Sequence, residues 1–340
     1  MSQRISSSQQ VGSLARELGV NLRTDPVEGI LNYCDRRINV LLDEYGECNS
    51  LSELLDWVAN RVETKFVPIN TDEELEELEH EYLGRKEWGF LHLAQELAGE
   101  NDFGITIRLL NKEPWDLTFV SVIDCRGDKS SRAYFTKWHE IAHILTLTSQ
   151  EETVFRRSHE PASGNEPKER LMDIIAGRIG FYPAITCKFI NGDISFEAIE
   201  ALRVQLCPEA SFQSALISFA RFWPKPCILV QAGMGLKKSE EALANQQSFF
   251  FSEEPKPALR VIQVTRSYTA RETGFFVPPR HRIPERSVIS DVFSQHIAYK
   301  EADECLSWWE SSGGKRLDPC SVSVKAKRGK DCVHALIVPL

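Results

Sequence analysis

The stretch RAYFTKWHEIAHILT, residues 132–146, contains the side chains on which the fold and the site depend. Its apolar residues recur every three to four positions, which predicts one helix over about 131–147. His139 and His143 are four residues apart, so both imidazoles lie on one face of that helix and can converge on one ion. Glu140 follows the first histidine, where its carboxylate can take a proton from an attacking water.

The flanks of these three residues favour a metal centre. Most of their neighbours are apolar or aromatic, namely Tyr134, Phe135, Trp138, Ile141, Ala142, Ile144 and Leu145. Polar groups on such a largely buried helix cost free energy unless they have a partner. A histidine pair on a solvated helix face is the plain alternative, and it fits these neighbours poorly. We therefore expect Zn²⁺, or else Mn²⁺, as the bound ion.

A catalytic zinc site needs a third protein ligand and keeps one open position. The next helix, predicted over about 167–180, offers Glu169 and Asp173, which are four residues apart and share a face. One of them can bind the metal while the other orients a ligand. His159, in the polar segment between the two helices, is a further candidate. No histidine follows His143 at the spacing of six residues that the longer zincin pattern requires.

The quoted stretch resembles the ImmA/IrrE family of metallopeptidases, whose members carry R-x-x-F-T-x-x-H-E-x-x-H-x-L after a pair of strands. In that family a later helix reads E-x-x-A-N-x-F-A and supplies the third ligand. The corresponding stretch here begins at Asp173 and reads DIIAGRIG. The resemblance implies Asp173 as the third ligand. Glu169 is the alternative because aspartate is one methylene shorter, and Gly177 stands where the family has asparagine.

The resemblance covers about residues 50–225 and implies a mainly helical, zincin-like core with a small sheet. It also implies a zinc-dependent endopeptidase that cleaves a regulatory protein, such as a helix-turn-helix transcriptional repressor. The setting would be a stress response, a mobile element or phage defence. Glu140 is then the catalytic base, and Tyr182, Tyr134 or His159 donates to the developing oxyanion. The alternative is a metal-bound sensor or scaffold that regulates transcription by binding without cleavage.

The predicted fold class is α+β, and four segments follow along the chain. They are an N-terminal helical segment (1–50), the metallopeptidase domain (51–186), a helical, helix-turn-helix-like segment (187–225) and a strand-rich C-terminal α/β domain (226–340). Some members of the family carry a GAF-like sensor domain at this place, and the length and strand content of residues 226–340 agree with that fold. Helices are expected over 11–45, 72–81 and 302–310. Strands are expected over 64–69, 104–110 and 117–125, and a loop over 148–168.

The composition indicates the cellular compartment of the protein and the class of partner that it binds. The 340 residues carry a formal net charge of −9, which disfavours direct binding to nucleic acid. The nine cysteines form no C-x-x-C pair, so we expect free thiols and a reducing cytoplasm. No apolar run reaches the ~20 residues of a membrane-spanning helix, and the polar N-terminus lacks the apolar part of a signal peptide. We expect a cytoplasmic protein whose partner is a protein substrate.

Overall fold

The computed structural model describes residues 5–21, 25–100, 102–148, 154–158, 167–237, 257–311 and 316–340. It has a mixed α+β fold with helices and two sheets, as predicted. The chain forms two compact units: unit 1 comprises Met1–Lys188 and Leu202–Ala215, and unit 2 comprises Phe189–Ala201 and Leu216–Leu340. The division into four segments stays a prediction. All nine cysteines are free, in agreement with the expected thiols.

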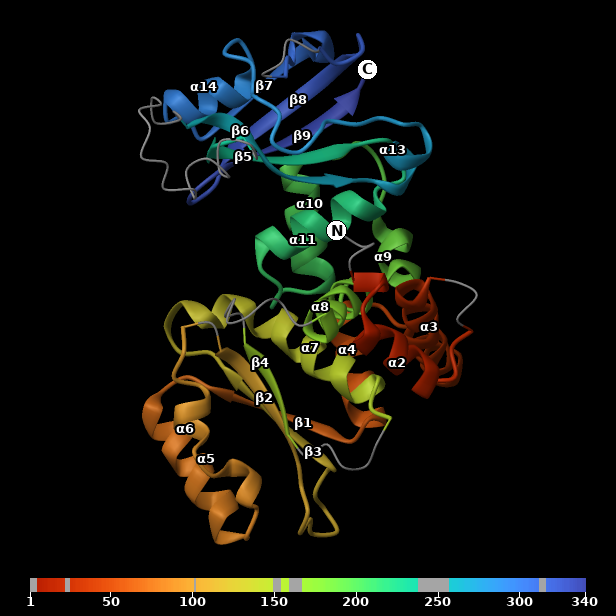
Figure 1. The fold of residues 1–340 in the computed structure, drawn as a ribbon, viewed down its shortest axis with the longest axis vertical. Helices are drawn as coiled ribbons and strands as arrows, with labels where there is room; N and C mark the ends of the chain where they lie inside the picture. Colours follow the sequence, from red (N-terminus) through yellow and green to blue (C-terminus); the bar gives the residue numbers. More distant parts are fainter. Residues whose placement is uncertain are drawn as a thin grey trace. The chain divides into compact units, whose positions relative to one another are not determined.

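Unit 1 contains a four-stranded sheet in the order β1-β3-β2-β4 (Figure 1). Its strands are β1 (Thr64–Ile69), β2 (Asp102–Arg108), β3 (Phe119–Asp124) and β4 (Val154–Ser158). β1 runs parallel to β3, whereas β2 runs antiparallel to β3 and β4. The helices are α2 (Gln9–Glu17), α3 (Pro26–Tyr45), α4 (Leu51–Arg61), α5 (Asp72–Gly84), η1 (Trp88–Phe90), α6 (Leu93–Glu96), η2 (Gly127–Arg132), α7 (Ala133–Leu145), α8 (Pro167–Ile179) and α9 (Pro183–Phe189).

The two faces of this sheet differ in polarity because side chains alternate along a strand. Ile105 and Ile107 of β2 lie in one hydrophobic cluster with Val120 and Val122 of β3 and the apolar side of α5. The opposite face carries the buried hydroxyls of Thr106 and Ser121, and α7 lies against that face. The sheet therefore presents two buried hydroxyls to the histidine-bearing helix.

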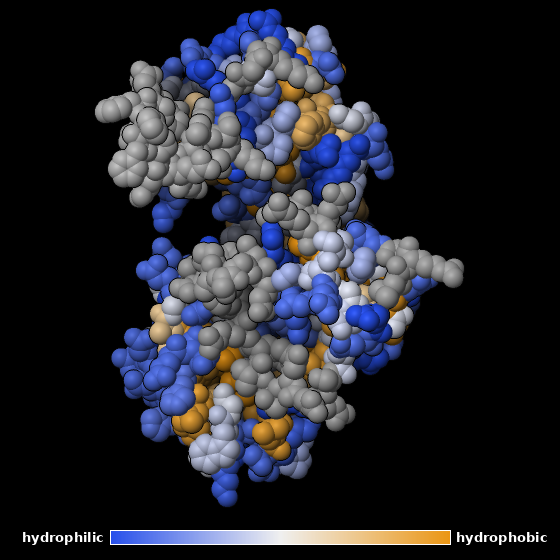
Figure 2. Space-filling model, in the orientation of Figure 1, coloured by the Kyte–Doolittle hydropathy of each residue, from blue (hydrophilic) through white to orange (hydrophobic). Residues whose placement is uncertain are grey.

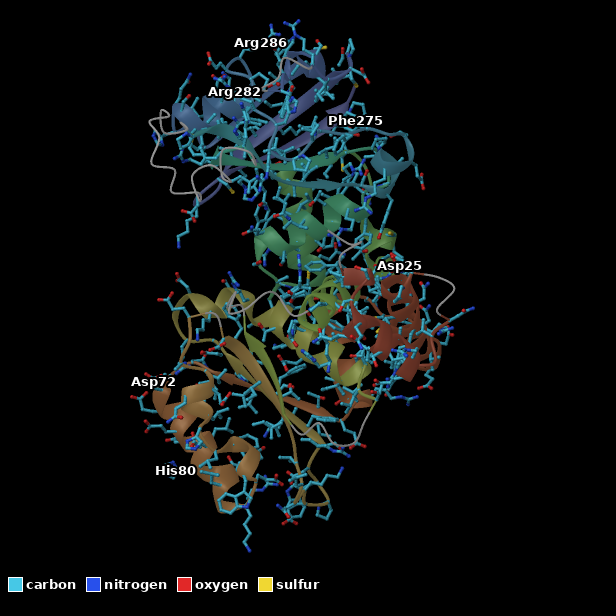
Figure 3. The ribbon with its side chains drawn as sticks, in the orientation of Figure 1. Asp25, Asp72, His80, Phe275, Arg282 and Arg286 are labelled. Carbon is cyan, nitrogen blue, oxygen red and sulfur yellow. The ribbon has the colours of Figure 1, made fainter. Side chains whose placement is uncertain are left out.

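Helix α5 confirms the helix expected over 72–81, and its acidic side chains form a face that is exposed to solvent. Leu75, Leu78 and Tyr82 are buried, whereas most of the carboxylates are exposed. Asp72 and His80 lie on its outward side (Figure 3), and hydrophilic residues cover this region of the surface (Figure 2). Among the described helices, none is long and apolar enough to cross a membrane.

Two predictions for unit 1 are wrong in detail. The helix expected over 11–45 is two helices, because Gly19 adopts a φ of +68° after α2 and Asp25 begins α3 (Figure 3). The Asp25 carboxylate accepts from the Val27 amide at 2.8 Å, and Pro26 occupies the first helical position. The segment expected to be a loop contains β4, which forms by pairing with β2. Pairing with a distant strand leaves no periodic signal in so short a segment.

Unit 2 contains a five-stranded antiparallel sheet in the order β6-β5-β9-β8-β7. The strands are β5 (Ile228–Gly235), β6 (Ala258–Arg266), β7 (Tyr299–Cys305), β8 (Ser321–Arg328) and β9 (Val333–Pro339). The short helices are α13 (Tyr268–Glu272), α14 (Val288–Ser294) and η3 (Leu306–Trp308). Two longer helices, α10 (Phe196–Leu206) and α11 (Phe212–Phe222), have residues in both units.

The prediction of a helix over 302–310 is wrong, because this segment forms most of β7 and all of η3. The strand pairs with β8 along its whole length, from Tyr299 opposite Lys327 to Cys305 opposite Ser321. Cross-strand pairing therefore overrides the local helical preference of the sequence. The GAF-like assignment of the C-terminal segment stays a prediction.

Asp124 ties the end of β3 to the segment that leads into α7. Its carboxylate is fully buried and lies 2.7 Å from both the Arg126 guanidinium and the Lys129 ammonium. Burial alone would raise the pKa of Asp124, but the hydrogen bonds from Arg126 and Lys129 outweigh burial and hold the pKa below its ordinary value.

We expect Asp124→Asn to lower the free energy of unfolding by about 2–4 kcal/mol, because both cations lose their buried partner. Since the folded-state pKa is depressed, this stability is present above the unfolded pKa of ~3.9 and is lost as the pH falls through the folded value. Urea unfolding at neutral and acid pH measures both effects. Asp72→Asn is the control, because Asp72 contacts the same Arg126 with a side chain that is 79% exposed. Equal losses in the two variants would contradict the prediction.

Candidate metal centre

Helices α7 and α8 lie side by side and carry the candidate residues. Near the N-terminal end of α7, the Tyr134 hydroxyl donates to the Gly180 carbonyl just after α8, at 2.6 Å. A Cβ atom at Gly180 would lie 2.8 Å from the Trp138 ring, so only glycine permits this close approach. Arg178 of α8 also pairs with Asp35 of α3 at 2.5 Å. These contacts fix the position of α8 relative to the histidines.

Three atoms from the two helices converge, and we call them the candidate metal cluster. They are Nε2 of His139, Nε2 of His143 and a carboxylate oxygen of Glu169. The two nitrogens are 3.1 Å apart, and the Glu169 oxygen is 3.2 Å from His139 and 3.5 Å from His143. Ligands bonded to zinc at about 2.0–2.2 Å in a tetrahedron lie ~3.3–3.6 Å apart. The observed spacing therefore suits a tetrahedral metal ion.

Asp173 contacts the other nitrogen of the His139 ring. Its carboxylate lies 2.9 Å from Nδ1, so a neutral ring that donates there presents a lone pair at Nε2. That lone pair faces the Glu169 carboxylate, and two acceptors at this distance repel unless a cation or a proton lies between them. A carboxylate behind a histidine ligand is a common feature of metal sites, where it fixes the ring orientation.

The burial of the cluster is uneven. The side chains of His139 and His143 are 2% and 3% exposed, whereas those of Glu169 and Asp173 are 31% and 33% exposed. Burial raises the pKa of Glu169. Where the two imidazoles carry protons at Nε2 instead, their hydrogen bonds and charge outweigh burial and hold the pKa well below its ordinary value. Glu169 is therefore an ionised carboxylate, which is the form that binds a metal.

Glu140 lies between α7 and the polar face of the sheet and is fully buried. Its Oε2 accepts from the Thr106 hydroxyl at 2.7 Å, and the Ser121 hydroxyl lies 2.6 Å from that of Thr106. Since Thr106 donates to Glu140, Ser121 must donate to Thr106. The other oxygen, Oε1, has no hydrogen-bond partner among the described residues. A Cβ at Gly104 would lie 2.6 Å from Thr136, so glycine allows α7 to approach β2 here.

Replacing Thr106 by the isosteric valine is expected to lower the free energy of unfolding by about 1–3 kcal/mol, because the buried Glu140 carboxylate loses its only donor among the described residues. Chemical denaturation measures the change. Thr64→Val is the matched control, since Thr64 is also buried in this sheet, and its hydroxyl donates to the Val62 carbonyl at 3.5 Å and to no carboxylate of the described residues. If both variants lose the same stability, the hydroxyl has no special role beneath Glu140.

The candidate oxyanion donors are engaged elsewhere or lie outside the described residues. The Tyr134 hydroxyl donates to Gly180, and that of Tyr182 donates to the Asn39 side chain at 2.7 Å. Both tyrosines are buried, and burial is the main reason that their pKa values are raised, that of Tyr182 to about 12. His159 lies outside the described residues. Sequence reasoning missed Thr106 and Ser121, although each interrupts an apolar strand segment.

Comparison with known proteins assigns neither a family nor a function to the chain, because the sequence matches no protein-family model and no curated protein. The resemblance to the ImmA/IrrE family therefore rests on the motif and stays a prediction. The donor set, two imidazoles and a carboxylate, is one that zinc prefers, and Mn²⁺ also accepts it. The residues present thus fit a divalent metal ion.

Proposed function

We propose that the protein is a zinc-dependent endopeptidase with a zincin-like core, in which His139, His143 and Glu169 hold the metal. The observation that carries the proposal is the convergence of their three ligand atoms at the spacing of a tetrahedral site. Asp173 takes the role of orienting His139 through Nδ1. The proposal thus gives the ligand role to Glu169 and the orienting role to Asp173, the reverse of what the family resemblance implies.

The chemistry is divided between the metal and Glu140. Zinc, when bound, supplies Lewis acidity that polarises the scissile carbonyl and makes water acidic enough to ionise near neutral pH. Glu140 accepts the proton of the attacking water at Oε1, the oxygen without a described partner, and then gives it to the leaving amine. Thr106 holds Oε2, so the carboxylate keeps one orientation through both transfers.

The substrate class follows from the family resemblance, which points to a helix-turn-helix transcriptional repressor. A net charge of −9 and the exposed carboxylates of α5 favour a basic partner, as a DNA-binding protein is. The test incubates the zinc-loaded protein with helix-turn-helix repressors encoded next to its gene. We expect cleavage at one defined bond, stopped by a zinc chelator. Repressors that stay intact under conditions where the protein holds zinc would contradict the proposed activity.

The burial of Glu140 favours a second candidate function. A carboxylate with no exposed surface and one oxygen bound to Thr106 is also suited to holding α7 against the sheet. In that case the protein holds a metal and regulates transcription by binding, without cleavage. The two functions differ in whether Glu140 is needed for anything beyond stability.

A further inference from the structure

A cavity of about 210 Å³ lies beside the candidate metal cluster, between α2 and the end of α7. His143 forms part of one wall, together with Thr146 and the residues that follow it. The facing wall belongs to α2, which contributes Ser13 and Leu14 among others. The N-terminal helix, remote in sequence from every candidate ligand, thus lies next to the cluster.

The volume limits what the cavity can hold. A cavity of about 150 Å³ accepts a benzene ring, whereas sites for free small molecules occupy about 300–1,000 Å³. The observed 210 Å³ therefore has room for one aromatic ring or one branched aliphatic chain. Because His143 lines the cavity, a side chain that enters it lies next to one of the three candidate metal ligands.

Three hydroxyl groups of the lining are bonded to protein atoms. The Thr148 hydroxyl donates to Glu17 at 2.6 Å, the Ser13 hydroxyl donates to the other carboxylate oxygen at 3.2 Å, and the Thr146 hydroxyl donates to a backbone carbonyl at 2.8 Å. The bonds from Thr148 and Ser13 lower the pKa of Glu17, and Lys168 adds an attraction of the same sign. The lining thus contains one carboxylate and one ammonium group of opposite charge, and this balance favours an uncharged occupant.

We propose that this cavity is the subsite for one uncharged, aromatic or branched side chain of the peptide substrate, and that α2 sets its size. The proposal rests on the proposed function and names the substrate preference of the same site. Leu14 supplies buried apolar surface, and Ser13 keeps the cavity open because its side chain is small. Helix α2 is thus a specificity-determining element.

The test measures binding of two amino-acid hydroxamates to the zinc-loaded, full-length protein by titration calorimetry. The hydroxamate group binds the metal in both compounds, and the side chain is benzyl in one and methyl in the other. We expect the benzyl compound to bind about 10–100-fold more tightly, because its ring is buried in the cavity. Ser13→Phe, which fills the cavity from a partly exposed position, is expected to reduce this ratio to about 1–3.

Gly12→Phe is the matched control, since Gly12 lies on the same helix and a Cβ there meets nothing within 4 Å. The Gly12→Phe variant is expected to keep the full preference for the benzyl over the methyl compound. Gln10→Phe, at an exposed position that also lines the cavity, repeats the test if Ser13→Phe fails to fold. Zinc binding without a side-chain preference, or a preference that survives both filling variants, overturns the subsite alone. Failure to bind zinc overturns the proposed function.

Discussion

Glu169→Ala is expected to weaken zinc binding by more than about 100-fold, so that the variant loses its metal on dialysis. Replacing groups that only support a metal ligand costs about 10–100-fold, and loss of a ligand costs more. Glu169 is the carboxylate that faces Nε2 of both His139 and His143, at 3.2 and 3.5 Å. Elemental analysis of the dialysed protein and competition with a chromophoric chelator measure the effect.

Asp173→Ala distinguishes the role of Asp173 from that of Glu169. Asp173 contacts Nδ1 of His139, so its loss removes the orienting group and leaves the three ligand atoms in place. We expect about one zinc per chain at saturation, bound about 10–100-fold more weakly than in the wild type. Glu77→Ala, an exposed carboxylate on α5, is the control and should change nothing. If Asp173→Ala loses its metal while Glu169→Ala keeps it, the roles are those that the family resemblance implies.

Much of unit 1 could be predicted because its elements have local signatures. The strands over 104–110 and 117–125 and the helices α7 and α8 are predicted within about two residues of their observed bounds, from β-branched enrichment and apolar periodicity. The spacing of His139 and His143 placed both rings on one face in the same way. Each of these inferences depends on residues within a few positions of one another.

The features of the site and fold that could not be predicted from the sequence depend on contacts between distant segments. Glu169 and Asp173 share a helix face, so only the approach of α8 to α7 decides which one meets Nε2 and which one meets Nδ1 of His139. The hydrogen bond from Thr106 to Glu140 also depends on distant segments. It forms because of the register of β2 against β3 and the place where α7 crosses these strands. Strands β4 and β7 were missed because pairing, not periodicity, creates them.

Glu140→Gln is expected to leave zinc binding unchanged and to lower kcat/KM for peptide cleavage by about 10²–10⁴-fold, the usual contribution of a general base. The glutamine side-chain oxygen can still accept from Thr106, so the substitution keeps the contact that holds the side chain. Its NH₂ group then occupies the position of Oε1 and cannot accept a proton. Thermal unfolding and elemental analysis show whether the fold and the metal site are intact.

This variant also decides between the two candidate functions, because they assign different work to the same buried carboxylate. If Glu140 only holds α7 against the sheet, Glu140→Gln regulates a reporter gene as the wild type does, and neither protein cleaves the repressor. If Glu140 is the base, the wild type cleaves the repressor, whereas the variant binds zinc, leaves the repressor intact and fails to relieve repression. Thr106→Val sharpens the comparison, since it leaves Glu140 able to accept a proton while removing the group that orients it. An activity loss in Thr106→Val smaller than that in Glu140→Gln, with zinc retained in both, is the pattern that proton transfer by Glu140 requires.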